Sequence, residues 1–313
     1  MNNRNSDSRT VEQKTNHLGF PKPGELIEMV GTHALEASDR AILNILYRYA
    51  HDSGRLAEPG AKWEIPLAVV REAFSSHESG DRLKDSLKRL KSVVVSVSYI
   101  DRQAGAKPEQ RVVITGLFAF FDISAKQLEK RATLRYQLPP ELVPIIAQSG
   151  YWGRIKAEIV CAMTSKYAMA LYEQVQLRAK LDRCVETIEI ERFREMLGVP
   201  PRSYKLGPDF TRFVLKPALL EVNGLSDMDV EIQLERRHAR APVHAVTMSW
   251  WHKQGDEYRA AMQERNRPKV GRMARLKGQV EQLVADKVAL VNAEVAGKLE
   301  RMRAEEREKL AAE

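Results

Sequence analysis

The 313-residue chain has little or none of what several protein classes require. It contains two cysteines, Cys161 and Cys184, whose spacing fits no zinc or redox motif and which are too few for a disulfide framework. No apolar run approaches the roughly 18 residues that a membrane span needs. The N-terminal stretch is polar and lacks the apolar segment that a signal peptide contains. These absences predict a cytoplasmic protein with reduced thiols and no membrane partner.

Sequence motifs of catalysis are missing as well. The chain has no G-x-x-x-x-G-K-[ST] segment for a Walker-type nucleotide site and no G-x-S-x-G nucleophile elbow. Its seven histidines include no His-x-His pair, which a metal-dependent DNA-nicking enzyme would need beside its tyrosine. Most carboxylates stand beside Lys or Arg on helix faces. We therefore expect a binding protein rather than an enzyme, with no metal ion and no cofactor.

Positive charge is what the chain has in excess. Lys and Arg number 50 against 42 Asp and Glu, which gives a formal net charge of +8. This balance favours a polyanionic partner, nucleic acid before membrane. The alternative is a basic soluble protein whose charges lie on solvated helix faces.

The order of predicted elements indicates an α+β fold with two tandem winged helix-turn-helix domains followed by a helical C-terminal tail. In the first domain, helices are expected at 37–50, 67–74 and 81–91, before a hairpin of strands 93–100 and 111–121. In the second, we expect a long helix at 155–181, a short strand at 187–189, helices at 191–197 and 208–223, and a hairpin of strands 228–234 and 242–250. The two copies share a layout, not an identity of residues.

Composition sets the expected domain limits. Residues 1–22 are polar and predicted to be a disordered tail; domain 1 spans 23–148 and domain 2 spans 149–255. From 256 to 313 glycine and aromatic residues nearly vanish, and a stripe of apolar residues at steps of three and four runs from Val280 to Met302. This charged helical tail is either solvated or docks on a partner.

The stretch 207–223 is the centre of the functional prediction. Its apolar residues recur at helical spacing and are expected on one buried side: Phe210, Phe213, Val214, Pro217 and Leu220. Arg212 and Lys216 are four apart and therefore neighbours on the helix surface. Pro217 lacks an N–H and clashes with the preceding turn, at a cost of about 3 kcal/mol in a regular helix, so we expect a kink.

Basic and aromatic residues around the two third helices are the candidate DNA contacts. In the first domain they are Arg82, Lys84, Lys88 and Arg89; in the second, Tyr204, Lys205, Arg212 and Lys216; in the wing that follows, Arg236, Arg237, His238 and Arg240. We expect helix 208–223 to enter a major groove, and the wing to contact phosphate or a minor groove. A solvated face is the competing interpretation of the 81–91 charges.

A set of residues between 165 and 223 forms a pattern that is typical of one protein family: Ser165, Tyr167, Leu171, Tyr172, Phe193, Leu197, Gly198, Tyr204, Lys205, Phe210, Val214, Leu215, Pro217, Ala218 and Asn223. On these residues the chain resembles, over about 165–250, the iteron-binding plasmid replication initiator family. Over 30–145 the layout agrees more than the residues do, and the tail beyond 256 lies outside the match.

The resemblance implies an origin-binding initiator. Monomers of such a protein bind directly repeated origin DNA (iterons), promote opening of an adjacent A+T-rich region, and lead to recruitment of the host initiator and replicative helicase. Dimers, in equilibrium with monomers, bind an inverted repeat and repress the initiator's own promoter. The family dimer involves the first domain, which makes strand 111–121 an interface candidate; the alternative is a wing strand packed on its own domain.

Two other functions stay open on the residues alone. One is a dimeric winged-helix transcriptional repressor without a replication role, which cooperative binding to direct repeats would distinguish from an initiator. The other is a nicking initiator of rolling-circle replication, which predicts magnesium-dependent cleavage and a covalent tyrosine–DNA product; the missing His-x-His pair speaks against it.

Overall fold

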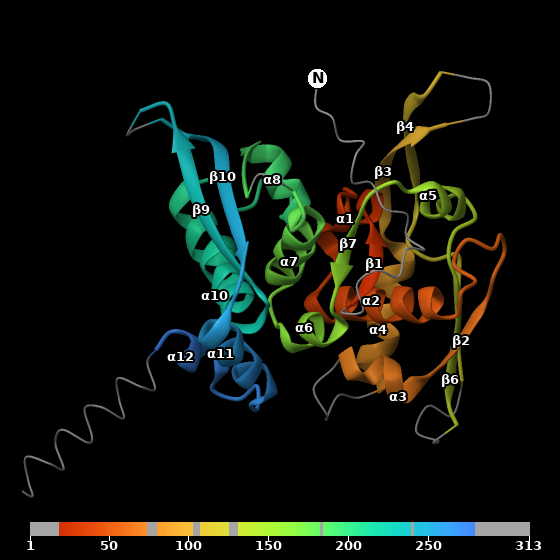
Figure 1. Cartoon of the computed structure of the whole chain (residues 1–313). Coiled ribbons are helices and arrows are strands. Elements are labelled where there is room, and N and C mark those ends of the chain that lie inside the picture. Colours follow the sequence, from red (N-terminus) through yellow and green to blue (C-terminus); the bar gives the residue numbers. More distant parts are fainter. Residues whose placement is uncertain are drawn as a thin grey trace, which may run out of the picture. The chain divides into compact units, whose positions relative to one another are not determined.

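The computed structural model describes residues 19–73, 80–102, 107–124, 131–181, 184–238 and 241–278. The chain divides into two units, Met1–Arg265 and Asn266–Glu313. The first unit contains both predicted domains (Figure 1).

The first domain contains three consecutive helices that are followed by a hairpin. The helices are α2 (Ala37–Asp52), α3 (Leu67–Val70) with a following 3₁₀ turn (Arg71–Ala73), and α4 (Gly80–Ser92). The hairpin pairs β3 (Val94–Asp101) with β4 (Glu109–Gly116). A second, antiparallel sheet has the order β2 (Trp63–Pro66), β6 (Thr133–Gln137), β5 (Phe120–Ile123), and α5 (Leu142–Gln148) follows it. As the spacing predicts, α4 buries Leu83, Leu87 and Leu90.

The single strand predicted at 111–121 is wrong. The chain forms β4 up to Gly116, and then β5 from Phe120, which belongs to the other sheet. Leu117 and Phe118, between them, are both buried. Consecutive residues of one strand point to opposite faces, so two adjacent buried side chains mark the place where the chain leaves the hairpin and enters the core.

The second domain repeats the layout, as predicted. Helices α7 (Lys166–Arg178) and α8 (Ile190–Leu197) precede a third helix, which runs through α9 (Gly207–Phe210), a π-helical segment η3 (Thr211–Leu215) and α10 (Lys216–Leu225). Strands β8 (Val185–Glu189), β9 (Met228–Arg236) and β10 (Val243–His252) form an antiparallel sheet in the order β8-β10-β9. Helix α11 (Gly255–Asn266) follows.

The long helix predicted at 155–181 is also wrong. It is divided into α6 (Ala157–Ala162) and α7 by the segment 163–165. Ser165 is the N-cap of α7, and its hydroxyl accepts a hydrogen bond from the Ala168 N–H at 3.3 Å. The Glu221 carboxylate accepts from the N–H groups of Thr164 and Ser165, both at 2.9 Å. These acceptors satisfy donors that would otherwise bond to a preceding turn, so a new helix begins there.

An N-terminal strand joins the two predicted domains. β1 (Phe20–Pro23) pairs antiparallel with β7 (Trp152–Ile155), and Phe20 and Lys22 are buried. The predicted disordered tail, 1–22, is therefore wrong at residues 20–22; residues 1–18 lie outside the described part of the chain.

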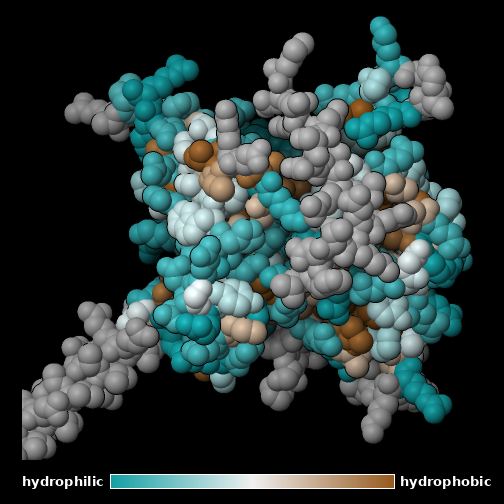
Figure 2. Space-filling view, in the orientation of Figure 1, coloured by the Kyte–Doolittle hydropathy of each residue, from teal (hydrophilic) through white to brown (hydrophobic). Residues whose placement is uncertain are grey.

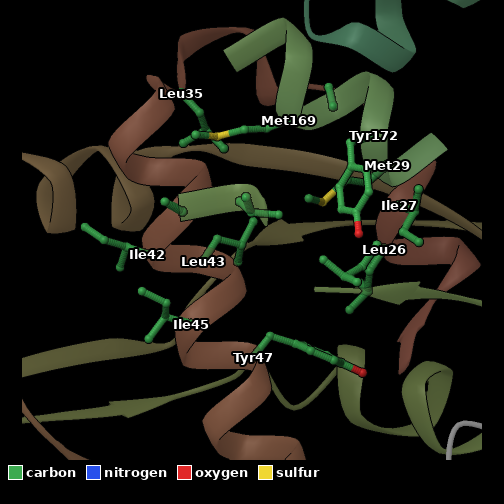
Figure 3. Close-up of a cluster of buried hydrophobic side chains, with 14 of the residues drawn as sticks. Leu26, Ile27, Met29, Leu35, Ile42, Leu43, Ile45, Tyr47, Met169 and Tyr172 are labelled. Carbon is green, nitrogen blue, oxygen red and sulfur yellow. The ribbon is translucent and has the colours of Figure 1, made fainter. Parts of the chain in front are cut away.

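Helix α7 lies at the centre of the first unit. It packs on α1 (Gly24–Ile27) and α2 on one side and on α8 and α10 on the other. Figure 3 shows Met169 and Tyr172 of α7 facing Leu35 and Met29 in a cluster of buried side chains. Both domains thus share one hydrophobic core.

The second unit is described only as far as residue 278, where it contains α12 (Arg272–Leu276). The apolar stripe expected from Val280 to Met302 lies outside the described residues. In the part of the chain that the structure covers, no helix combines the length and apolarity of a membrane span.

Candidate nucleic-acid interface

We call residues 207–225 the recognition helix of the second domain. It runs through a π-helical segment in which the Lys216 N–H bonds to the Thr211 carbonyl, five residues back. Pro217 follows directly, in the first turn of α10. In a regular α-helix its ring would collide with the carbonyl four residues earlier. The wider π turn is the irregularity that the sequence predicts at this proline.

The π turn changes which residues face the solvent. Phe210 and Val214 are buried as predicted, and Arg212 and Lys216 are exposed as predicted. Phe213 was expected on the buried side, but its exposed fraction is 46%. A π segment has more residues per turn than an α-helix, so the α-helical periodicity assigns Phe213 to the wrong side.

An aromatic cluster of Tyr204, Arg212 and Phe213 lies on this exposed side. The rings of Tyr204 and Phe213 stack, with centroids 5.6 Å apart and planes inclined by 29°. The Arg212 guanidinium lies 5.1 Å from the Phe213 ring centroid, within range of a cation–π interaction. The cluster restrains side chains that would otherwise be mobile on a helix surface.

The turn that leads into the recognition helix is held by Arg194 of α8. Arg202 and Tyr204 adopt positive φ angles of 65° and 48°, which is unfavourable for residues with a side chain. The buried Arg194 guanidinium donates to the carbonyls of Ser203 and, at 3.1 Å, Tyr204. It also lies 5.1 Å from the Phe210 ring centroid. The sequence carries no signal for this role, because the partner carbonyls are nine and ten residues away.

Tyr204 also meets Tyr167 of α7. Burial raises the pKa of Tyr167 to about 12, with further contributions from the charge of Tyr204 and a side-chain hydrogen bond with it. The Tyr167 hydroxyl therefore stays protonated at neutral pH and can serve as a donor beneath the candidate interface.

Two side chains fix the far end of the recognition helix to the wing. The Asn223 amide donates to the Val230 carbonyl at 3.0 Å and accepts from the Val230 N–H at 2.9 Å. The Lys253 ammonium donates to the carbonyls of Ser226 and Met228, both at 3.1 Å, and to the Asn223 carbonyl. Burial lowers the pKa of Lys253, and the nearby Asp229 partly offsets this shift. A cation at a helix C-terminus satisfies its last carbonyls.

One of the predicted wing contacts, Arg236, is exposed but also has partners within the domain. Arg236 donates to the Ala241 carbonyl at 2.6 Å across the hairpin turn. Its Nη2 lies 2.5 Å from the place where a Cβ on Gly207 would stand, so it lies against the first residue of the recognition helix. Arg237 and His238 are exposed. Arg240 lies outside the described residues.

In the first domain, α4 presents Arg82, Lys84 and Lys88 at the surface, and the Lys88 ammonium is 3.4 Å from the Asp85 carboxylate. Arg89 also has a structural role that the sequence does not predict. It donates to the two carboxylate oxygens of the fully buried Asp39 at 2.7 and 3.0 Å. The Arg89 guanidinium thereby fastens α4 to the start of α2. Its side chain is still 32% exposed, and the DNA contact stays a prediction.

Two sequence models of protein families match this chain. One, described as "Initiator Replication protein, WH1", matches residues 25–176. The other, described as "Initiator Rep protein, WH2", matches residues 189–250, and together they cover more than half of the chain. The chain belongs to the initiator replication protein family. It is a replication initiator with two winged-helix domains, as the resemblance of residues 165–250 implies.

One solved structure shows the same fold over most of its length. The initiator is similar to a structure described as the Pi initiator protein in complex with iteron DNA, with a TM-score of 0.53 and 14% identity over 75% of this chain and 97% of that one. It also matches a structure of domains 2 and 3 of RctB, with a TM-score of 0.41 and 12% identity over 68% of this chain and 81% of that one. The first likeness supports the winged-helix fold.

Substitution by alanine is expected to have different effects at Arg89 and at Lys84 of the initiator. Arg89→Ala leaves the buried Asp39 carboxylate without its guanidinium and should lower the free energy of unfolding by about 2 kcal/mol. Lys84→Ala should change stability by less than about 0.5 kcal/mol but lower the slope of log K against log salt in DNA binding by about 1. Urea denaturation and binding across a salt series measure the two effects. Equal stability of both variants would contradict the structural role of Arg89.

Proposed function

We propose that this initiator binds directly repeated origin DNA (iterons) sequence-specifically, promotes opening of the origin and recruits the replicative helicase with the host initiator. It would act in the cytoplasm by binding rather than catalysis, without a metal ion or cofactor. The observation that supports this best is the recognition helix, which carries Arg212 and Lys216 on its exposed side and is fixed at both ends by Arg194 and Lys253.

The chemistry of the exposed side suits the major groove. A guanidinium can donate two parallel hydrogen bonds to the N7 and O6 atoms of guanine, and an ammonium pairs with phosphate as a point charge. Lys205 adds a further exposed cation just before the helix begins. The exposed Arg82, Lys84 and Lys88 of α4 offer a second cationic helix. Two such helices in one chain fit a long asymmetric site better than a short one.

Binding of the purified protein to its origin fragment and to scrambled DNA of equal length, across a salt series, tests the proposal. A preference of about a thousandfold at physiological salt supports sequence-specific binding, and stepwise occupancy with repeat number supports iterons. Equal affinity for both DNAs, falling steeply with salt, would leave only attraction to phosphate and refute the proposal.

Dimerisation is the second part of the proposal, with the β3–β4 hairpin as its surface. Val94, Ile100, Val112 and Ile114 share one face of the hairpin by its register. Val112 and Ile114 are 58% and 71% exposed. Figure 2 shows that the face of the molecule in view is largely hydrophilic, with smaller apolar areas between the hydrophilic ones. The apolar face of the hairpin favours association with a second copy, and the dimer would bind an inverted repeat and repress the initiator's own promoter.

Ile114→Glu is expected to raise the dimer dissociation constant at least about tenfold, because it places a carboxylate twice in the proposed interface. Analytical ultracentrifugation over a concentration series measures this constant. Gln233→Glu adds the same charge at an exposed position of β9 and should leave it unchanged. A dimer equally stable in both variants would place the interface elsewhere.

A further inference from the structure

In the aromatic cluster the apolar ring of Phe213 is exposed close to cationic side chains. Phe213 stands between Arg212 and the Val214–Leu215 pair that enters the core, and Lys216 follows three residues after Phe213. Its ring is nearly half exposed although the helix has a buried face available. Leaving a phenylalanine in water forgoes the stabilisation that its burial would give. The stack with Tyr204 keeps this ring in one position on the exposed side.

We propose that Phe213 is a specificity-determining residue that contacts the C5-methyl group of a thymine in the major groove. The proposal rests on the proposed function, since it requires the recognition helix to enter that groove. A phenylalanine ring neither donates nor accepts a strong hydrogen bond and carries no charge, so phosphate and the polar base edges are poor partners. Thymine alone among the four bases presents an apolar group there.

The neighbours of Phe213 determine how the ring meets the DNA. Arg212 lies against the ring, and a cation in that position is drawn to the phosphates or to a guanine edge. The guanidinium thereby brings the ring to the floor of the groove with it. Tyr204 supports the ring and is itself fixed by Arg194, whose buried guanidinium bonds to the Tyr204 carbonyl at 3.1 Å. The contact is therefore preorganised before DNA binds.

Deoxyuridine tests this contact, since it differs from thymidine only in lacking the methyl group. The full-length protein is titrated with origin-repeat DNAs in which one thymine at a time is replaced by deoxyuridine. Wild-type protein is expected to lose about fourfold in affinity at one position, the loss that one buried methyl group gives. Phe213→Ala should bind the thymine DNA more weakly and show no further loss from deoxyuridine at that position.

Two further variants keep the test decisive. Phe213→Leu retains a smaller apolar side chain and should show a reduced deoxyuridine penalty at the same position. Leu206→Ala removes another exposed apolar side chain, 67% exposed, just before the recognition helix, and should keep the full penalty.

Each outcome separates this proposal from the proposed function. Strong preference for origin DNA without a deoxyuridine effect at any position overturns the thymine contact and leaves the proposed function standing. A penalty that persists unchanged in Phe213→Ala or Phe213→Leu assigns the methyl contact to another residue and also overturns it. Absence of any preference for origin DNA refutes both the thymine contact and the proposed function.

Discussion

Glu173→Ala is expected to lower the free energy of unfolding by about 3–5 kcal/mol. The Glu173 carboxylate of α7 accepts from the Lys22 ammonium of β1 at 2.9 Å and from the Asn44 amide of α2 at 2.6 Å. All three side chains are buried. Burial lowers the pKa of Lys22, and the charge and hydrogen bond of Glu173 act in the opposite direction. Without Glu173 the ammonium is left in the core with only the Asn44 oxygen, at 3.3 Å.

Urea denaturation measures the loss, with Glu231→Ala, at an exposed position of β9, as the control. The double variant Lys22→Met/Glu173→Leu should recover most of the stability, because replacing a whole buried ion pair by apolar side chains is often neutral. A single variant within 1 kcal/mol of wild type would show that the pair is not needed to join β1, α2 and α7. Recovery in the double variant would show that the cost arises from the orphaned charge.

The layout of the protein follows from patterns that are local in the sequence. The leucines of α4, at 83, 87 and 90, fall at helical spacing and are buried. In β3 the buried Val95 and Val97 alternate with more exposed residues. The exposed positions of Arg212 and Lys216 follow from the same periodicity. These predictions need only the neighbours within one or two turns, and the family match confirms the two winged-helix domains to which they lead.

Some features that the local pattern does not predict depend on a partner far away in the chain. The helix predicted at 155–181 breaks because Glu221, more than fifty residues later, accepts from the donors that start α7. Arg89 is 32% exposed but pairs with Asp39, fifty residues earlier, which the local pattern does not predict. Phe213 differs, since Pro217 four residues on imposes a π turn that shifts the helical phase. The sequence shows that an irregularity is needed at this proline, but it does not predict that the irregularity is a π turn.

Glu221→Ala is expected to lower the free energy of unfolding by about 3 kcal/mol. The buried Glu221 carboxylate accepts from the N–H groups of Thr164 and Ser165 at 2.9 Å each and from the Thr164 hydroxyl. Alanine leaves these part-buried donors without their carboxylate. Each lost bond to a charged group costs about 1.5–3 kcal/mol, and hydration of the donors returns some of it. Glu221→Gln keeps one acceptor oxygen and should lose roughly half as much. Urea denaturation ranks the three proteins.

The same variant should also weaken sequence-specific DNA binding more than non-specific binding. Glu221 belongs to the recognition helix, and its bonds to the start of α7 fix where the exposed Lys216, five residues earlier, is presented. Attraction to phosphate tolerates small displacements, but base contacts depend on hydrogen-bond geometry. The ratio of affinities for origin and scrambled DNA, measured well below the unfolding transition, should therefore fall at least about fivefold, the equivalent of about 1 kcal/mol. If stability falls while this ratio is unchanged, the Glu221 bonds hold the core together but do not aim the recognition helix.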